Sequence, residues 1–144
     1  MWRETLQKLS SDLTFKAPAL DEEIDQIQTE LGVSPPDELR SLLGESNGVE
    51  GEYGLGLLWD VERIIEDNRR FRTFPDFAEL YMPFDCLLFF GDAGNGDQFA
   101  FPILGGRIRR PDIFVWNHED DSRSWVAPSL QTYFEWWESG KLTV

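Results

Sequence analysis

The sequence predicts one α+β domain in which helices pack around a mostly antiparallel central sheet. Helical spacing of apolar residues dominates the first half of the chain, whereas short apolar strands at close intervals dominate the second half. The loops that join the later strands are too short for the crossover that a parallel pair needs. Because 144 residues suffice for one hydrophobic core, we expect a single domain over residues 1–144.

Two helices are expected first. Leucines recur at helical spacing before Pro18, so residues 1–18 are expected to form an N-terminal helix or arm. An apolar stripe from Leu20 to Leu31 predicts a second helix, with acidic residues in its first turn. Gly32 follows at the position where a left-handed residue commonly ends a helix.

A third helix and the first strand come next. Ser34 is expected to cap the helix, with Pro35 at its first position and Gly44 at its end. A glycine-rich stretch over residues 48–56 leads into the apolar segment Leu57–Trp59, which predicts a strand.

A fourth helix occupies the middle of the chain. Asp60 is placed to cap it, and apolar residues up to Phe71 lie at helical spacing. Residues 73–83 contain two prolines and are expected to be a connection. The run Cys86–Phe90 predicts a buried strand, in which a cysteine usually behaves as a small hydrophobic residue.

Three more strands are expected after a glycine-rich loop. Residues 98–104 form the first, although Pro102 places it toward an edge or a bulge. Gly105–Gly106 is a candidate tight turn. Short strands are also expected over residues 113–117 and 124–126.

Pro128 is expected to open a last helix, which Gly140 ends. Its apolar stripe includes Trp137, so Trp136 lies at the edge of that stripe or outside it. Trp136 is therefore expected either to be an interface anchor or to pack on the first helix.

The charge of the chain restricts its partners. There are 13 Lys and Arg against 27 Asp and Glu, a formal net charge of −14. This argues against nucleic acid and against anionic membrane surfaces, and it favours a cationic partner. One His and one Cys exclude an intrachain disulfide and a zinc site of cysteines and histidines. The first residues open no apolar run and no stretch could span a membrane, so we expect a cytoplasmic protein.

The loop over residues 91–97 is the single segment whose residues most strongly suggest a functional site. Gly91, Gly94 and Gly96 permit positive φ angles and close backbone approach. The loop matches neither a calcium-binding EF-hand nor a phosphate-binding loop. A purely structural interpretation is a strained turn in which the side chain of Asp97 forms a hydrogen bond with its own backbone.

A second polar segment gathers one imidazole and three carboxylates in His118, Glu119, Asp120 and Asp121. Together with Asp92 or Asp97 this segment could bind a divalent metal or carry out acid–base chemistry. The alternatives are a solvated acidic loop and an anionic patch for a basic partner.

Several segments, in their order and spacing, resemble the SUKH superfamily, which includes the Smi/Knr-type cell-wall-assembly regulators of fungi. The resemblance covers about residues 20–138, with Val49 in place of the second glycine of the family's Asn-Gly-Gly segment and Pro128 ahead of the last helix's serine. The segments are Ile24–Leu39, Ser46–Gly51, the glycine loop within Phe89–Phe99, Val115–Glu119, and Ala127–Leu130 with the aromatic helix that follows.

The resemblance implies an α+β fold without established catalysis, cofactor or metal. Bacterial members are regarded as immunity proteins that neutralise toxins, often nucleases, whereas fungal members act as regulatory scaffolds. We therefore expect a monomer or weak homodimer that binds a basic cognate toxin. The alternatives are a scaffold, and an enzyme or small-ligand module that uses the glycine loop and His118. The expected contact residues are Asp92, Asn95, Asp97, His118, Glu119, Asp120, Asp121, Glu50 and Glu52, with Gly91, Gly94 and Gly96 shaping the loop.

Overall fold

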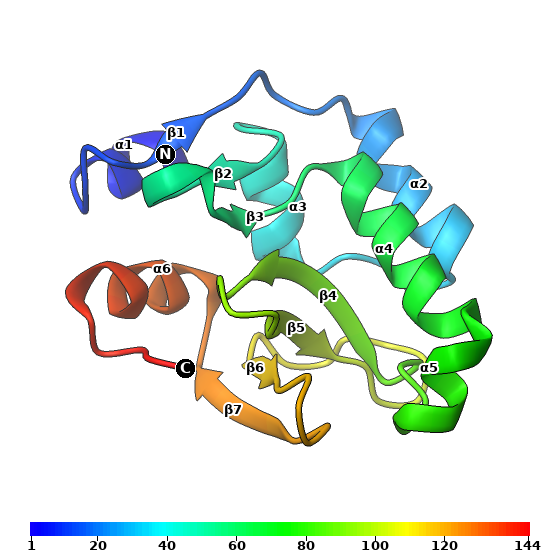
Figure 1. The fold of residues 1–144 in the computed structure, drawn as a ribbon. Coiled ribbons are helices and arrows are strands. Elements are labelled where there is room, and N and C mark those ends of the chain that lie inside the picture. The colour runs from blue at the N-terminus through cyan, green and yellow to red at the C-terminus, as the bar shows by residue number, and fades with distance from the viewer.

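The computed structural model describes residues 1–144 and contains two antiparallel sheets bordered by helices (Figure 1). This confirms the predicted α+β class. The elements in chain order are α1 (Trp2–Gln7), β1 (Thr14–Phe15), α2 (Asp21–Leu31), α3 (Asp37–Leu43), β2 (Val49–Glu50), a 3-10 turn (Glu52–Gly54), β3 (Gly56–Leu58), α4 (Val61–Thr73), α5 (Pro75–Leu80), β4 (Leu87–Asp92), β5 (Gln98–Pro102), β6 (Ile113–Trp116), β7 (Arg123–Ala127) and α6 (Leu130–Ser139).

The strands form two sheets rather than one central sheet. Strands β1, β2 and β3 make a three-stranded sheet, and β4, β5, β6 and β7 make a four-stranded sheet, each in that order. Where the two sheets meet, the backbone N–H of Trp59 donates to the carbonyl of Phe90 at 2.8 Å. The next residue, Asp60, caps α4 by accepting a hydrogen bond from the N–H of Arg63 at 2.8 Å, so the chain leaves the strand direction there.

Strand β5 lies inside its sheet, which corrects the expectation of an edge position. Pro102 is tolerated because it stands at the last position of β5, opposite Leu87. The tight turn at Gly105–Gly106 is confirmed: both glycines have positive φ, and Leu104 bridges to Arg107.

Residues 1–18, expected to be a helix or an arm, contain a short helix that ends at Gln7, and β1 follows it. The start of the next-but-one helix differs from expectation. The third helix begins at Asp37 instead of being capped by Ser34. A residue that precedes proline disfavours helical angles, which delays the start past Pro35.

Two further differences lie at prolines. Pro75 occupies the first position of a short helix, α5, inside the segment expected to be a connection. The last helix is capped by Ser129, whose side chain accepts from the N–H of Thr132 at 3.1 Å, so Pro128 precedes the helix instead of opening it. The end of that helix at Gly140, in the left-handed conformation, is confirmed.

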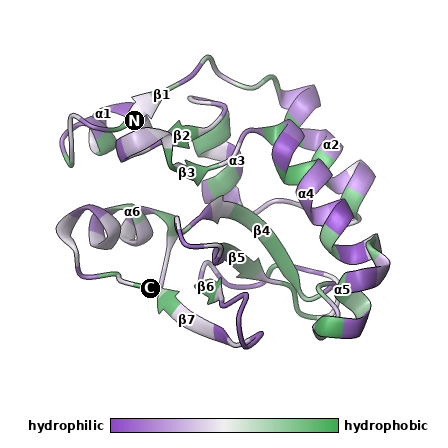
Figure 2. Ribbon diagram, viewed as in Figure 1, coloured by the Kyte–Doolittle hydropathy of each residue, from purple (hydrophilic) through white to green (hydrophobic).

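One hydrophobic core runs between the sheets and the helices. Figure 2 shows hydrophobic residues concentrated on β4, which is central to this core, and hydrophilic residues on the outer sides of α2 and α4. Cys86 is exposed because it precedes β4, which corrects the expectation of a buried position. Trp136 is half-buried and lies against Trp125, at 6.1 Å between ring centroids. None of the helices combines the length and the apolar character needed to cross a bilayer.

Candidate functional site

The glycine loop and the histidine segment lie against each other. One carboxylate oxygen of Asp97 accepts the N–H of His118 at 3.1 Å and lies 2.7 Å from the ring Nδ1. A Cβ at Gly96 would lie 2.8 Å from the imidazole Cε1, so the absence of a side chain lets the ring cover the loop. Asp97 is only 5% exposed, so its role is to hold the two segments together. The turn inside the loop is made by Asn95, whose side chain accepts from the N–H of Asp97 at 3.0 Å.

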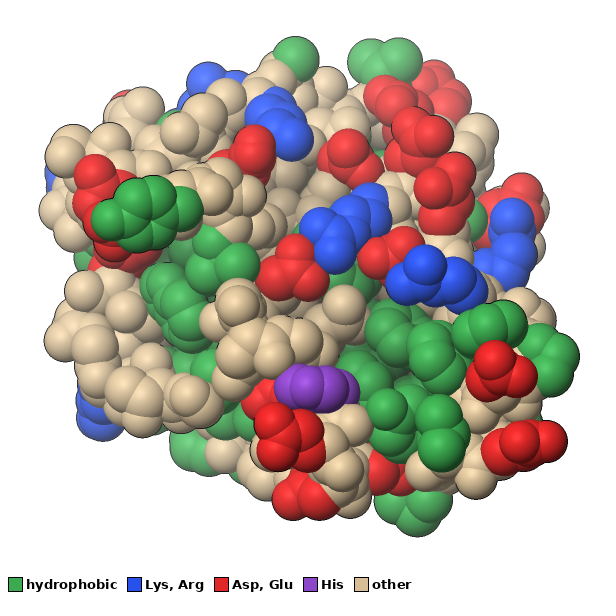
Figure 3. All heavy atoms as spheres, in the orientation of Figure 1, with side chains coloured by type: hydrophobic (Ala, Val, Ile, Leu, Met, Phe, Trp, Pro, Cys, Tyr) green, Lys and Arg blue, Asp and Glu red, His purple; other side chains and the backbone are tan.

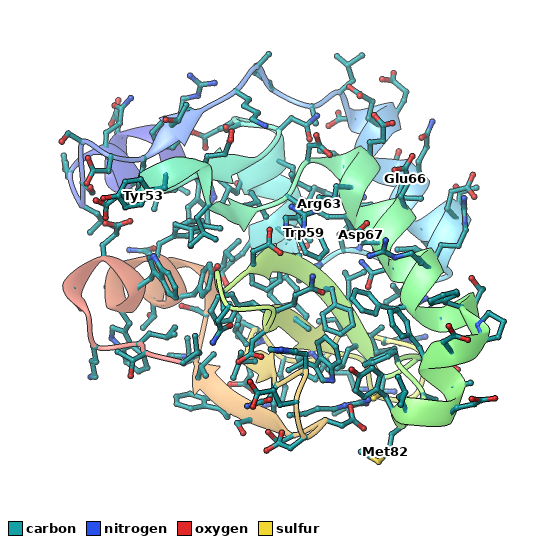
Figure 4. The ribbon with its side chains drawn as sticks, in the orientation of Figure 1. Tyr53, Trp59, Arg63, Glu66, Asp67 and Met82 are labelled. Carbon is teal, nitrogen blue, oxygen red and sulfur yellow. The ribbon has the colours of Figure 1, made fainter.

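Asp92 forms an ion pair with an arginine of the same chain. Its two carboxylate oxygens accept hydrogen bonds from the guanidinium of Arg63 at 2.8 and 3.0 Å. The same guanidinium binds Asp67 at 3.0 Å and lies 4.2 Å from the ring centre of Trp59 (Figure 4). Burial alone would lower the pKa of Arg63, but the hydrogen bonds to both carboxylates raise it overall. This arrangement ties α4 to the end of β4.

A groove of about 490 Å³ opens beside this ion pair, and we call it the central groove. Tyr53 stands at its rim with 97% of its surface exposed and a positive φ of 60°. A Cβ at Gly56 would lie 3.2 Å from a carboxylate oxygen of Asp92, so this glycine keeps the groove open. Of the expected contact residues, Glu50 and Asp92 line the central groove, together with the loop-shaping Gly94 and Gly96.

The four residues of the histidine segment separate into two roles. Asp121, at a positive φ of 62°, accepts hydrogen bonds from Trp116 at 2.8 Å, Arg123 at 3.0 Å and the N–H of Met82 at 2.8 Å. Burial would raise the pKa of Asp121, but these three hydrogen bonds lower it overall. Asp121 is therefore structural. By contrast, Glu119 and Asp120 are exposed.

The two glutamates expected in the contact surface also differ. Glu50 pairs with Lys16 at 3.7 Å. Glu52 is exposed and close enough to raise the pKa of Glu138. Burial is the largest cause of that raised pKa; Ser10 opposes it through a hydrogen bond, and the charge of Asp12 adds to it. This acidic cluster thus lies toward the N-terminal arm and α6.

No three His, Cys, Asp or Glu side chains come together in a group that could hold a metal ion. The expected alternative of a divalent site needed His118 with Asp92 or Asp97. The structure brings only Asp97 to His118, because Asp92 is turned to Arg63.

A second acidic surface was missed from the sequence. Helices α2 and α4 pack side by side, and a groove of about 350 Å³ runs between them. Arg69 is the one cation among its charged residues, and it pairs with Glu30. Spacing was the signal that could have found it, since acids four and seven residues apart share one helix face. The acids of this groove, here called the α2–α4 groove, are Glu23, Glu30, Asp60, Glu62 and Glu66.

Comparison with known families gives one match. The family model SUKH_6, described as SMI1-KNR4 cell-wall, matches residues 21–134. The match contains the glycine loop, the histidine segment and both helices of the α2–α4 groove, and it omits α1 and β1. A search of curated proteins found no match to this sequence.

Proposed function

The chain belongs to the SUKH_6 (SMI1-KNR4) family, and from that premise we propose that it is a non-enzymatic immunity protein. It binds and neutralises a cognate toxin domain with a basic surface, for example a nuclease. The net charge of −14 supports this proposal because opposite charges steer two proteins together and select the partner.

The observation that carries the proposal is the placement of unpaired acids. Figure 3 shows acidic side chains over α2 and α4, and again beside the histidine, on the same side of the molecule. Glu62 and Glu66 are exposed on α4, and Glu119 and Asp120 are exposed in the histidine segment. We call these four residues the acidic face. A basic domain that spans both segments meets negative charge at both of them, with the partly exposed arginines Arg63 and Arg69 and apolar atoms between.

The carboxylates that bind groups inside the protein hold the acidic face in shape. Asp97 and Asp121 hold the loops, and Asp92 holds α4 to β4, so replacing them would alter the shape of the surface as well as its charge. Asn95 and Glu119 remain available because both are exposed. We therefore expect the exposed residues to contact the toxin directly and the buried carboxylates to position the loops that carry them.

The test uses the toxin domain encoded by the gene directly upstream, purified and titrated calorimetrically with the full chain. We expect the toxin domain to bind the chain tightly, and this binding to weaken steeply between about 50 and about 500 mM salt, because salt screens exposed charges. The variants Glu62→Gln/Glu66→Gln and Glu119→Gln/Asp120→Asn should each lower the affinity and flatten this salt dependence. Glu4→Gln/Asp37→Asn removes the same charge from exposed sites elsewhere and serves as the matched control. Equal weakening by the control pair would show that only net charge matters.

The family description, which names cell-wall proteins, favours a scaffold or regulatory module as the second candidate. An immunity gene normally lies directly downstream of a large toxin gene, and a scaffold gene need not. No binding to the upstream toxin domain would move the conclusion to the scaffold.

A further inference from the structure

An apolar surface lies at the end of α5 and is not part of the acidic face. Leu80 is 68% exposed, Met82 is 60% exposed and Phe74 is 43% exposed. The three residues lie within nine positions of one another, and Phe74 and Met82 line a hollow of about 220 Å³. We call these three residues the α5 patch. Clustered exposed apolar residues, unlike scattered ones, mark interaction surfaces.

The α5 patch stands on a rigid aromatic base. The ring of Phe77 lies 5.0 Å from that of Phe74 and 5.2 Å from that of the buried Phe71. Phe77 also contacts Tyr81, at 5.9 Å between ring centroids. Binding to such a surface orders few new side chains, which is the property that distinguishes strong interface anchors.

The backbone under Met82 is held on both sides. Its N–H donates to Asp121 at 2.8 Å, and its carbonyl accepts from Arg123 at 2.9 Å. Arg123 also donates to the carbonyl of Pro83 at 3.0 Å and pairs with Asp121 at 3.0 Å. The fold therefore fixes this main chain while it leaves the thioether side chain in solvent, as Figure 4 shows for the labelled Met82.

The α5 patch is continuous with the acidic face. The hydroxyl of Tyr81 donates to the carbonyl of His118 at 3.0 Å, and the next two residues after His118 are the exposed acids Glu119 and Asp120. Figure 3 shows apolar and acidic atoms side by side in this region. The exposed acids that flank the patch on its other sides are Asp76, Glu79 and Asp85.

Two cations beside the patch are turned inward. Arg72 donates to the carbonyls of Leu31 and Leu87, and Arg123 donates to the carbonyls described above. Arg70 is exposed and its guanidinium lies 5.9 Å from the ring centre of Phe71, but the exposed acids around the patch outnumber it, so the rim is mainly acidic. A second copy of this chain would bring an identical acidic rim against it, and like charges at a contact are unfavourable.

We propose that the α5 patch is the hydrophobic anchor of the toxin interface, taking an apolar side chain that the basic partner presents among its lysines and arginines. This inference rests on the proposed function. Charge pairs at an exposed rim mainly raise the association rate, whereas a desolvated apolar anchor slows dissociation. Asp121 and Arg123 are positioning residues for Met82.

The experiment compares Leu80→Ser/Met82→Ser with the matched control Leu20→Ser/Leu104→Ser, since Leu20 and Leu104 are also more than half exposed. Both variants are full-length chains, and urea unfolding checks that they fold like the wild type. Binding of the upstream toxin domain is followed by surface plasmon resonance at low and high salt. We expect the patch variant to dissociate at least tenfold faster at both salt concentrations, with an unchanged salt dependence, and the control to bind within twofold of wild type.

Three results would overturn the inference. If the patch variant binds within twofold of wild type while the acidic variants weaken binding, the anchor is wrong and the proposed function stands. If the wild type does not bind the toxin domain, the proposed function fails and the anchor fails with it. If sedimentation shows a wild-type dimer that the patch variant abolishes, the occupant is a second copy and not the toxin.

Discussion

The substitution Gly91→Ala should destabilise the protein far more than an added methyl group suggests. A Cβ at Gly91 would overlap the carbonyl oxygen of Leu57, and it would lie 3.1 Å from the carbonyl carbon of Leu57 and 3.2 Å from the hydroxyl of Tyr133. The obstacle is the backbone of β3, which cannot rotate away as a side chain can. Strands β3 and β4 would have to separate by roughly 1 Å to restore ordinary contact.

The magnitude follows from the bonds at this junction. Separation strains the hydrogen bond from Trp59 N–H to Phe90 and the one from Tyr133 to the carbonyl of Leu57, both 2.8 Å long. Each is worth about 1 kcal/mol, and overpacking a core costs about 1 to 3 kcal/mol. We expect a loss of about 3 kcal/mol in the free energy of unfolding, or about 10 °C in Tm for a domain of this size.

Urea unfolding followed by tryptophan fluorescence measures this loss directly. Gly44→Ala is the matched control, because Gly44 ends α3 with ordinary helical angles and a Cβ there would approach nothing closer than 3.4 Å. The control should be neutral or slightly stabilising, since alanine restricts the unfolded chain. A loss below about 1 kcal/mol for Gly91→Ala would refute the reasoning, because a contact of this kind with backbone cannot relax so cheaply.

Three further results are expected. Asp97→Ala should cost about 1 to 2 kcal/mol in urea unfolding, because the N–H of His118 loses its acceptor, and it should weaken toxin binding less than the acidic-face variants do. Tyr133→Phe should cost about 1 kcal/mol in the same assay, because the buried carbonyl of Leu57 is left without its hydroxyl partner. The folded pKa of Asp121 is lowered by its hydrogen bonds against the effect of burial, so its contribution to stability is complete above the unfolded pKa of about 3.9 and is lost as pH falls through the folded value. Asp121→Asn should therefore be less stable than wild type near neutral pH, and the gap should close below about pH 4 in acid titrations of the unfolding free energy; a gap that is constant with pH would contradict this.

Most of the helices and strands were predictable because their signals are local. Asp60 caps α4 through a residue three positions later, and Gly140 ends α6 through its own backbone angles. Where prediction failed, the cause was also local and identifiable. The prolines before Asp37 delayed one helix, and Pro75 started another inside an expected connection.

The candidate site was only partly predictable. That the glycine loop and the histidine segment meet was among the expected possibilities, and the contact between Asp97 and His118 confirms it. That Asp92 faces Arg63 was not expected, because the two are 29 positions apart and nothing in either segment indicates the pairing. The spacing of the acids on each helix was readable in the sequence, but that they form one α2–α4 groove depends on the two helices packing side by side.

The sequence by itself determined the class of fold, the N-cap of α4, the C-terminal end of α6, the resemblance to the family and the excess of negative charge. Each of these depends on composition or on residues within one turn or one loop. The tertiary structure decided which carboxylates are exposed and which form hydrogen bonds or ion pairs within the protein. Asp121 supports Met82 and Glu119 faces solvent although the two residues are neighbours in one acidic segment. A carboxylate becomes structural when distant donors converge on it, and only the packing of the elements places those donors.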